Sequence, residues 1–196
     1  MKQNVIVFLI PLSVMILLFA FGFYTINQTP VITNEELESH VLLDLEAEAV
    51  NEGVEIDLTW RWTDVPEDNI VGNDFMEIIV YTEEMTPIQE VDWETGKLTL
   101  TQSGNPIYDT EDKVLTESGV AFTFPSKVEE EAIFGASGNI TMFLQELDQS
   151  AAHVGVRYYH TWFDTPFDLA AGDDISAVID DYGEAYWMIQ RTIPLP

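Results

Sequence analysis

The stretch that decides the fold is VEIDLTWRW at residues 54–62. Apolar side chains occupy every second position, and polar or charged side chains occupy the positions between them. Because successive side chains of a β-strand point to opposite faces, this alternation predicts a strand with one face in a core and the other in solvent. Trp60 and Trp62 belong to the apolar face and are predicted to be buried.

The residues around this stretch predict more strands. Residues 43–49 read LDLEAEA, and the turn residues 51–53 separate this run from the first, which indicates a hairpin. Turn residues also bound further candidate strands at 76–82, 97–102, 119–124, 139–146, 153–163 and 185–193. About eight strands without long helices between them indicate an all-β fold, an antiparallel β-sandwich.

One or two short helices are predicted beside these strands. Residues 127–134 are one candidate. Residues 174–182 are the other, because paired aspartates suit a helix amino end and Gly183 follows its last turn. Thr33 and Glu36 have the spacing of a capping box, which predicts a turn of helix before the first strand.

Part of this pattern resembles a known architecture. LTWRW at 58–62, a loop that contains Pro66, and MEIIVY at 76–81 together resemble the second-to-third strand passage of immunoglobulin-like and fibronectin type III sandwiches. The resemblance implies an immunoglobulin-like sandwich or an expanded variant, because the chain is longer than those modules. It implies architecture only, since such sandwiches host many functions.

An uncharged apolar run at residues 5–24 precedes all 35 acidic residues. About 20 apolar residues are enough for a helix to cross a bilayer, so this run predicts an N-terminal transmembrane helix. Lys2 is the only Lys or Arg before Arg61, which places the amino end in the cytoplasm and the rest of the chain outside. A cleaved secretory signal is the alternative, because small residues flank Phe21 at positions that signal peptidase reads.

Both alternatives export the remainder of the chain. We therefore expect a membrane anchor or uncleaved signal at 1–26, a stalk at 27–39 and an acidic extracytoplasmic domain at 40–196. The chain contains no cysteine, so the exported domain folds without disulfides. The formal net charge of the whole chain, −28, excludes nucleic acid as a partner, because the phosphates would repel it.

The excess of carboxylates has two interpretations. It is either an adaptation of the surface to its medium, or a sign of calcium binding, since calcium takes six to eight oxygen ligands. No loop follows the D-x-[DN]-x-[DN]-G pattern, so calcium is the one cofactor considered and none is assigned. Three clusters are candidates: Asp64, Glu67, Asp68, Asn73 and Asp74; Asp109, Glu111 and Asp112; and Asp173 and Asp174 with Asp180 and Asp181.

Two aromatic residues are predicted to bind a ligand at the surface. Trp93 lies on a loop-like stretch between two acidic residues, and Trp162 is followed by Phe163. Exposed tryptophans stack on sugars or anchor protein partners. His153 and His160 are seven residues apart in one predicted strand, so they face opposite sides and do not form a local metal site.

No motif of a catalytic nucleophile or zinc protease is present, and no catalytic residue is assigned. The sequence favours a cell-surface domain that works by non-covalent recognition of an unknown protein or cell-wall partner. A carboxylate-dependent surface hydrolase acting on a glycan is one alternative. A cation-binding or sensory ectodomain is another.

Overall fold

The computed structural model describes residues 2–26, 31–51, 53–145, 147–164, 167–183 and 185–196. The chain divides into two compact units, Met1–Val31 and Ile32–Pro196. The first contains helix α1, Lys2–Ile26, with Pro11 inside it. Taken over the described residues, no helix is long and apolar enough to cross a membrane. The first residues of the expected stalk, 27–30, lie outside the described residues.

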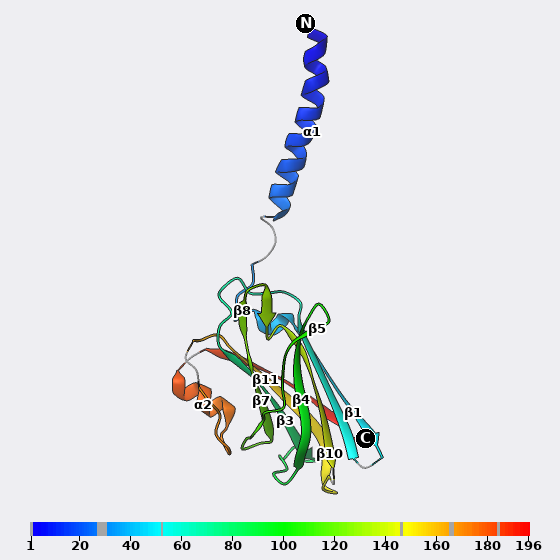
Figure 1. Cartoon of the computed structure of the whole chain (residues 1–196), viewed down its shortest axis with the longest axis vertical. Helices are drawn as coiled ribbons and strands as arrows, with labels where there is room; N and C mark the ends of the chain where they lie inside the picture. The colour runs from blue at the N-terminus through cyan, green and yellow to red at the C-terminus, as the bar shows by residue number, and fades with distance from the viewer. Residues whose placement is uncertain (1, 27–30, 52, 146, 165–166, 184) are drawn as a thin grey trace. The chain divides into compact units, whose positions relative to one another are not determined.

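The second unit is built from two five-stranded antiparallel sheets. Sheet A contains, in spatial order, β1 (Val41–Val50), β2 (Gly53–Trp62), β10 (Ser137–Gln145), β4 (Asp92–Gln102) and β5 (Asn105–Thr110). Sheet B contains β12 (Tyr186–Pro194), β11 (Ala151–Thr161), β3 (Asn73–Thr82), β7 (Val120–Pro125) and β6 (Val114–Leu115). Figure 1 shows β11, β7 and β3 on the side nearer helix α2 (Ile175–Tyr182), and β4, β10 and β1 on the other.

The predicted antiparallel sandwich is confirmed, although it is larger than expected. The described residues form twelve strands rather than about eight. The predicted helical turn at 127–134 is wrong, because β8 (Lys127–Glu129) and β9 (Ala132–Phe134) pair as a small hairpin. Its turn holds Glu130 at a φ of 55°, a left-handed conformation that ends β8 and reverses the chain into β9.

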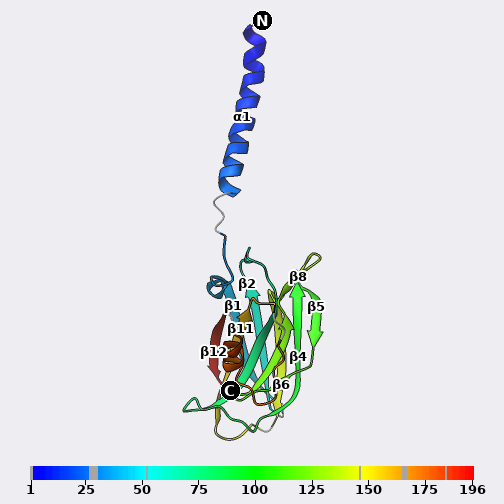
Figure 2. The same ribbon diagram turned by 90° about the vertical axis from the view of Figure 1, so that its left-hand side faces the viewer.

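The two sheets differ in how their faces are covered. Strand β2 alternates between core and solvent as predicted, with Trp60 and Trp62 only 2% and 6% exposed. Strand β3 is buried on both faces over most of its length. Its inner side chains pack against sheet A, while Phe75 on its outer face packs with Ile175 and Ile179 of α2. Figure 2 views the domain from the side that carries α2.

Helix α2 has the caps that the sequence predicted. The side chain of Asp174 accepts a hydrogen bond from the backbone N–H of Ala177 at 3.0 Å, which satisfies a free donor of the first turn. Gly183 follows the helix in the left-handed conformation, with a φ of 69°. These caps fix a helix of only eight residues on the outer face of sheet B.

Residues 32–40 belong to the same compact unit as the sandwich, although the sequence had suggested a stalk up to residue 39. Thr33 and Glu36 form the predicted capping box, with each side chain accepting from the other's backbone N–H. The 3₁₀ turn η1 (Leu37–His40) follows, and Leu37 is fully buried. The buried residues of this segment, Ile32, Asn34 and Leu37, form no strand or helix pattern that a sequence would reveal, so the segment had been interpreted as a stalk.

Candidate functional site

One end of the sandwich encloses a buried polar network centred on His160 and Asp74. Both residues are 0% exposed. Nδ1 of His160 lies 3.0 Å from each carboxylate oxygen of Asp74, and Nε2 lies 3.0 Å from Oδ1 of Asn34. The network therefore joins β3 and β11 to the docked segment before β1.

Each member of this network has hydrogen-bond partners within the protein. The amide of Asn34 donates through Nδ2 to the backbone oxygens of Asp68 and Asn69, at 2.6 and 3.2 Å, so its Oδ1 accepts from His160. Asp74 accepts from the Tyr158 hydroxyl at 2.7 Å and from the Thr161 backbone N–H at 3.2 Å. Both ring nitrogens of His160 therefore have a hydrogen-bond partner, and the ring and the Asp74 carboxyl group form a fully buried pair.

Three tryptophans pack around the His160–Asp74 pair. The rings of Trp187, Trp62 and Trp162 lie 4.8, 5.3 and 5.6 Å from the imidazole ring, centroid to centroid. Nε1 of Trp62 donates to the Tyr158 hydroxyl at 3.1 Å. Burial and the neighbouring Asp74 carboxylate hold the pKa of Tyr158 well above its ordinary value, so this phenol stays protonated. Every polar group of the network has a partner, which is the pattern of a structural core rather than of an open site.

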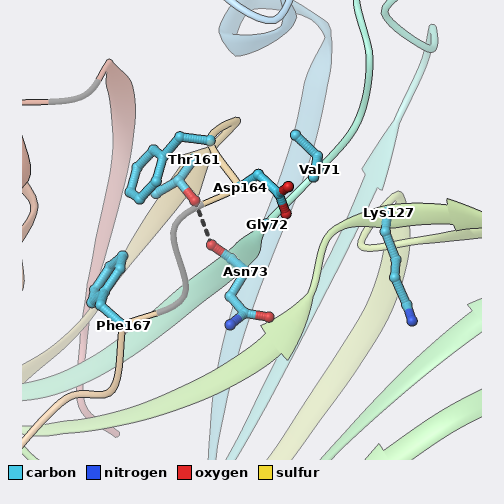
Figure 3. A pocket seen from close by; sticks show the side chains of 8 residues that line it. Val71, Gly72, Asn73, Lys127, Thr161, Asp164 and Phe167 are labelled. Atoms are coloured by element: carbon cyan, nitrogen blue, oxygen red, sulfur yellow. Dashed lines mark hydrogen bonds between the residues drawn. The ribbon is translucent and has the colours of Figure 1, made fainter.

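A cavity of about 250 Å³ lies next to this network. Asn73, Thr161 and Asp164 contribute its polar groups, and Phe163 and Phe167 contribute stacked rings with centroids 5.8 Å apart. In Figure 3 the hydroxyl of Thr161 points at the backbone oxygen of Asn73, to which it donates at 2.6 Å. The same view shows Lys127 turned away from Asn73.

Lys127 forms an ion pair with Glu129, with 2.6 Å between Nζ and Oε2. Its ammonium group is thereby occupied. The cavity is also smaller than the roughly 300–1,000 Å³ typical of ligand pockets. The paired lysine and the small volume make this cavity a weak candidate for a ligand-binding site.

A larger cavity, of about 520 Å³, lies beside Trp93. We call it the Trp93 cavity. Its apolar lining comes from Val91, Trp93, Leu115 and Val120, and its charged lining comes from Asp92, Glu111, Asp112 and Lys113. It is formed where residues 111–113 carry the chain from β5 in sheet A to β6 in sheet B.

A β-bulge places Trp93 in this wall. Along β10 and β4, Phe143 is opposite Thr95 but Gln145 is opposite Asp92, so the register shifts by one residue. The shift turns Trp93 to the core side of sheet A, where it is 7% exposed. The prediction of a surface loop at Trp93 is therefore wrong, because alternation counted along a single strand does not reveal a bulge.

A tight turn builds the opposite wall. Thr116 donates from its hydroxyl to Glu77 at 2.5 Å and accepts from the Gly119 backbone N–H at 2.9 Å. A Cβ on Gly119 would lie 2.1 Å from the backbone oxygen of Ile78, so only glycine fits between the turn and β3. The turn sets Leu115 and Val120 side by side on paired strands. Leu115 is 55% exposed, which is unusual for an apolar residue beside a cavity.

The structure brings together two predictions that the sequence had kept separate. Trp93 was a candidate aromatic ligand-binding residue, and Glu111 and Asp112 belonged to a candidate calcium cluster; all three line the Trp93 cavity. Asp109 of that cluster lies outside it and pairs with Lys97 at 2.7 Å, a contact that raises the pKa of Lys97.

The other candidate calcium ligands have separate roles. Asp64 lies 2.7 Å from Nδ1 of His40, and that hydrogen bond, followed by one from Thr63, lowers its pKa. Asp68 accepts from the Asn34 backbone N–H at 2.8 Å, Asp173 accepts from that of Ala170 at 2.7 Å, and Asp174 caps α2.

Glu67 has an exposed side chain. Across the described ranges, no group of three or more His, Cys, Asp or Glu side chains is arranged to hold a metal ion. The candidate ligands therefore do not converge on one point.

Trp162, the second predicted ligand-binding aromatic, lines neither cavity and packs half-buried against the core. Sequence reasoning missed the apolar wall formed by Leu115 and Val120. The visible signal was an exposed leucine close to the acidic residues at 111–112, followed by the Ser-Gly turn at 118–119.

Comparison with known proteins adds little to this geometry. No protein-family profile and no curated protein sequence matches the chain. A solved structure titled "AvmM Catalyzes Macrocyclization in Alchivemycin A Biosynthesis" is similar with a TM-score of 0.36 and 12% identity, over 80% of this chain and 88% of that one. A penta-haem cytochrome c552 from Thermochromatium tepidum is similar with a TM-score of 0.42 and 10% identity, over 83% of this chain and 41% of that one. Similarity this distant supports no conclusion about activity.

Proposed function

We propose that the chain is a membrane-anchored, extracytoplasmic β-sandwich that works by non-covalent recognition, and that the Trp93 cavity is its binding site. The observation that carries the proposal is the cavity itself. Its volume of about 520 Å³ falls in the range of ligand pockets, and its lining combines four apolar side chains with four charged ones. The 250 Å³ cavity beside Asn73 is smaller than that range.

A site-specific crosslinking experiment tests this proposal. The chain contains no cysteine, so a single Leu115→Cys substitution gives one attachment point for a photo-crosslinker at the cavity wall. Leu42→Cys on β1 is the matched control, since Leu42 is 53% exposed and far from the cavity in strand order. We expect a discrete adduct on intact cells from position 115 and none from position 42. Identical adducts from both positions, or none from either, contradict recognition at this cavity.

The membrane anchor rests on the sequence. Residues 5–24 are uncharged, Lys2 precedes them, and every acidic residue follows them. Protease added to wall-stripped cells should digest the sandwich domain from outside, whereas the uncut chain should remain in the membrane fraction. A mature chain beginning near Phe23 in the medium would establish a cleaved signal in place of the anchor. Protection of the domain from protease would contradict export altogether.

The carboxylate-dependent hydrolase is a second candidate function, because Asp92, Glu111 and Asp112 lie on one cavity. Glycoside hydrolysis needs two carboxyl groups, about 5 Å apart for retention or about 6.5–9.5 Å apart for inversion. Release of reducing sugar from cell-wall glycan by the purified chain, abolished by Glu111→Gln, would favour this candidate. No release by the wild-type chain would remove it.

A further inference from the structure

The four buried tryptophans of the sandwich differ in whether their indole N–H groups have a hydrogen-bond acceptor. Three of them donate to a protein acceptor: Trp60 to the Gly135 backbone oxygen at 2.9 Å, Trp62 to the Tyr158 hydroxyl at 3.1 Å and Trp187 to the Asn34 backbone oxygen at 2.8 Å. Trp93 is buried to the same extent, yet its Nε1 has no acceptor within the part of the chain that the structure describes.

This donor faces the cavity rather than the core. Among the described residues, the fully buried side-chain polar atoms without a partner are Ser126 Oγ and His153 Nδ1, and Trp93 Nε1 is not one of them. Trp93 also lines the cavity. The indole N–H is therefore open to the cavity, where a carbonyl group of a ligand can replace the water that this donor otherwise binds.

The charges around this donor select the rest of the ligand. The carboxylates of Asp92, Glu111 and Asp112 line the cavity, and none makes a hydrogen bond or close ion pair with another described side chain. Lys113 supplies one positive charge against these three. A chain with a net charge of −28 also attracts cations over a long range, and a cleft concentrates that attraction.

The apolar wall selects the shape of the cation. Val91, Leu115 and Val120 offer a surface on which an aliphatic stem can pack while its charged end reaches the carboxylates. A metal ion would leave this wall and the indole N–H unused. An arginine or lysine side chain with an adjacent peptide carbonyl uses all three features. Arginine fits better, because its planar fork pairs with two carboxylate oxygens at once.

We propose that the Trp93 cavity binds a basic, arginine-bearing segment of a polypeptide partner. The Asp92, Glu111 and Asp112 carboxylates pair with the guanidinium group, the apolar wall covers its stem, and Trp93 Nε1 donates to a peptide carbonyl. This ligand class rests on the proposed recognition function and makes it specific.

Titration of the full-length chain with short probe peptides tests the ligand class. The probe is acetylated and amidated Arg-Gly-Arg, compared with Lys-Gly-Lys and with a peptide in which neutral citrulline replaces arginine. Calorimetry at about 0.15 M NaCl limits the action of remote charges, since the Debye length is then about 8 Å. We expect the arginine peptide to bind at one site, the lysine peptide more weakly, and the citrulline peptide at least about tenfold more weakly than arginine.

Variants distinguish the cavity from general attraction to an acidic surface. Asp112→Asn and Trp93→Phe should each weaken binding of the arginine peptide, the first by about tenfold, which corresponds to about 1.4 kcal/mol. Glu46→Gln is the matched control, because it removes the same charge from an exposed position on β1. An equal loss in the control would overturn the proposal in favour of non-specific attraction.

Two further outcomes would also overturn it. Equal binding of the citrulline peptide would show that charge is not recognised. Full displacement of the peptide by submillimolar calcium, with a calcium response lost in Asp112→Asn, would assign the cavity to a cation. If the crosslinker at position 115 captures a specific partner while no arginine peptide binds, recognition stands and the ligand class is wrong. If neither result is obtained, both proposals fail.

Discussion

Two groups of carboxylates in this domain differ in their burial and in their hydrogen-bond partners. Asp74 lies in the core, and each of its contacts is matched by a donor from His160, Tyr158 or Thr161. Glu111 and Asp112 lie on an open cavity with no such donors within the described residues. The tryptophans differ in the same way, since the indole N–H of Trp187, which packs on His160, has a protein acceptor and that of Trp93 does not. Polar groups whose hydrogen bonds are satisfied within the protein stabilise the fold, whereas polar groups without a protein partner remain available to a ligand.

The largest effect should follow from removing Asp74. Asp74→Ala leaves two buried groups, Nδ1 of His160 and the Tyr158 hydroxyl, without their hydrogen-bond partner. Each unsatisfied buried group costs about 1–3 kcal/mol, so the two together should cost about 2–6 kcal/mol. Denaturant unfolding should therefore show a loss of that size. Asp112→Ala should change the free energy of unfolding by about 0.5 kcal/mol or less. Equal losses in the two variants would remove the distinction between the groups.

A smaller effect should separate the two tryptophans. Trp187→Phe removes the donor to the Asn34 backbone oxygen, and an unsatisfied buried group costs about 1–3 kcal/mol. Trp93→Phe removes no protein hydrogen bond among the described residues, so its cost should be limited to lost packing. Thermal unfolding of both variants measures the difference. A larger loss in Trp93→Phe than in Trp187→Phe would contradict the assignment of its N–H to the cavity.

These contrasts show what one sequence can and cannot predict. Alternation at 54–62 predicted β2 and the burial of Trp60 and Trp62, because period-two burial is a local property of a strand. The caps of α2 and the Thr33–Glu36 box were also predicted, since each depends on residues within one turn.

The rest depends on contacts between distant parts of the chain. Asn34, Asp74 and His160 meet only through the fold, and Trp93 turns inward because of a bulge against β10. Glutamates at 129–131 favour helix intrinsically, yet pairing overrides that preference and forms β8 and β9. An acid inside an apolar strand, such as Glu77 in MEIIVY, was the one local signal of a buried polar network.

Alkaline pH should lower the stability of the domain through its buried tyrosines. Burial, followed by the charge of Glu77, raises the pKa of Tyr159 to about 12, and burial, followed by the charge of Asp74, raises the pKa of Tyr158 well above its ordinary value. Unfolded tyrosine ionises near pH 10, so only the unfolded state loses protons between about pH 10 and 12. Stability should be constant below about pH 9 and fall above pH 10, by at most about 1.4 kcal/mol per pH unit for each tyrosine.

Tyr159→Phe is the control for this pH profile. It removes one of the phenols with a raised pKa, which are Tyr81, Tyr158 and Tyr159, so the decline above pH 10 should be shallower in the variant than in the wild-type chain. Urea midpoints measured between pH 8 and 11 provide the comparison. An unchanged slope would show that ionisation of Tyr159 does not contribute to the loss of stability at alkaline pH.

The smallest effect concerns the exposed carboxylates as a whole. Sodium chloride screens their mutual repulsion, so the melting temperature should rise gradually with salt. Calcium at matched ionic strength should add little, because the candidate ligands do not converge among the described residues. A saturable rise specific to calcium would instead indicate a site, since binding to the folded state alone stabilises it by about 2.7 kcal/mol at a hundredfold excess over Kd.

The indole N–H resonances offer the most direct test of the central claim. The chain has five tryptophans, and Trp93→Phe identifies the resonance of Trp93 in a ¹⁵N–¹H spectrum. On titration with the Arg-Gly-Arg peptide, that resonance should shift and saturate, while those of Trp60, Trp62 and Trp187 stay in place because their donors are already bonded within the protein. A Trp93 resonance that does not move, or four resonances that move together, would contradict the account.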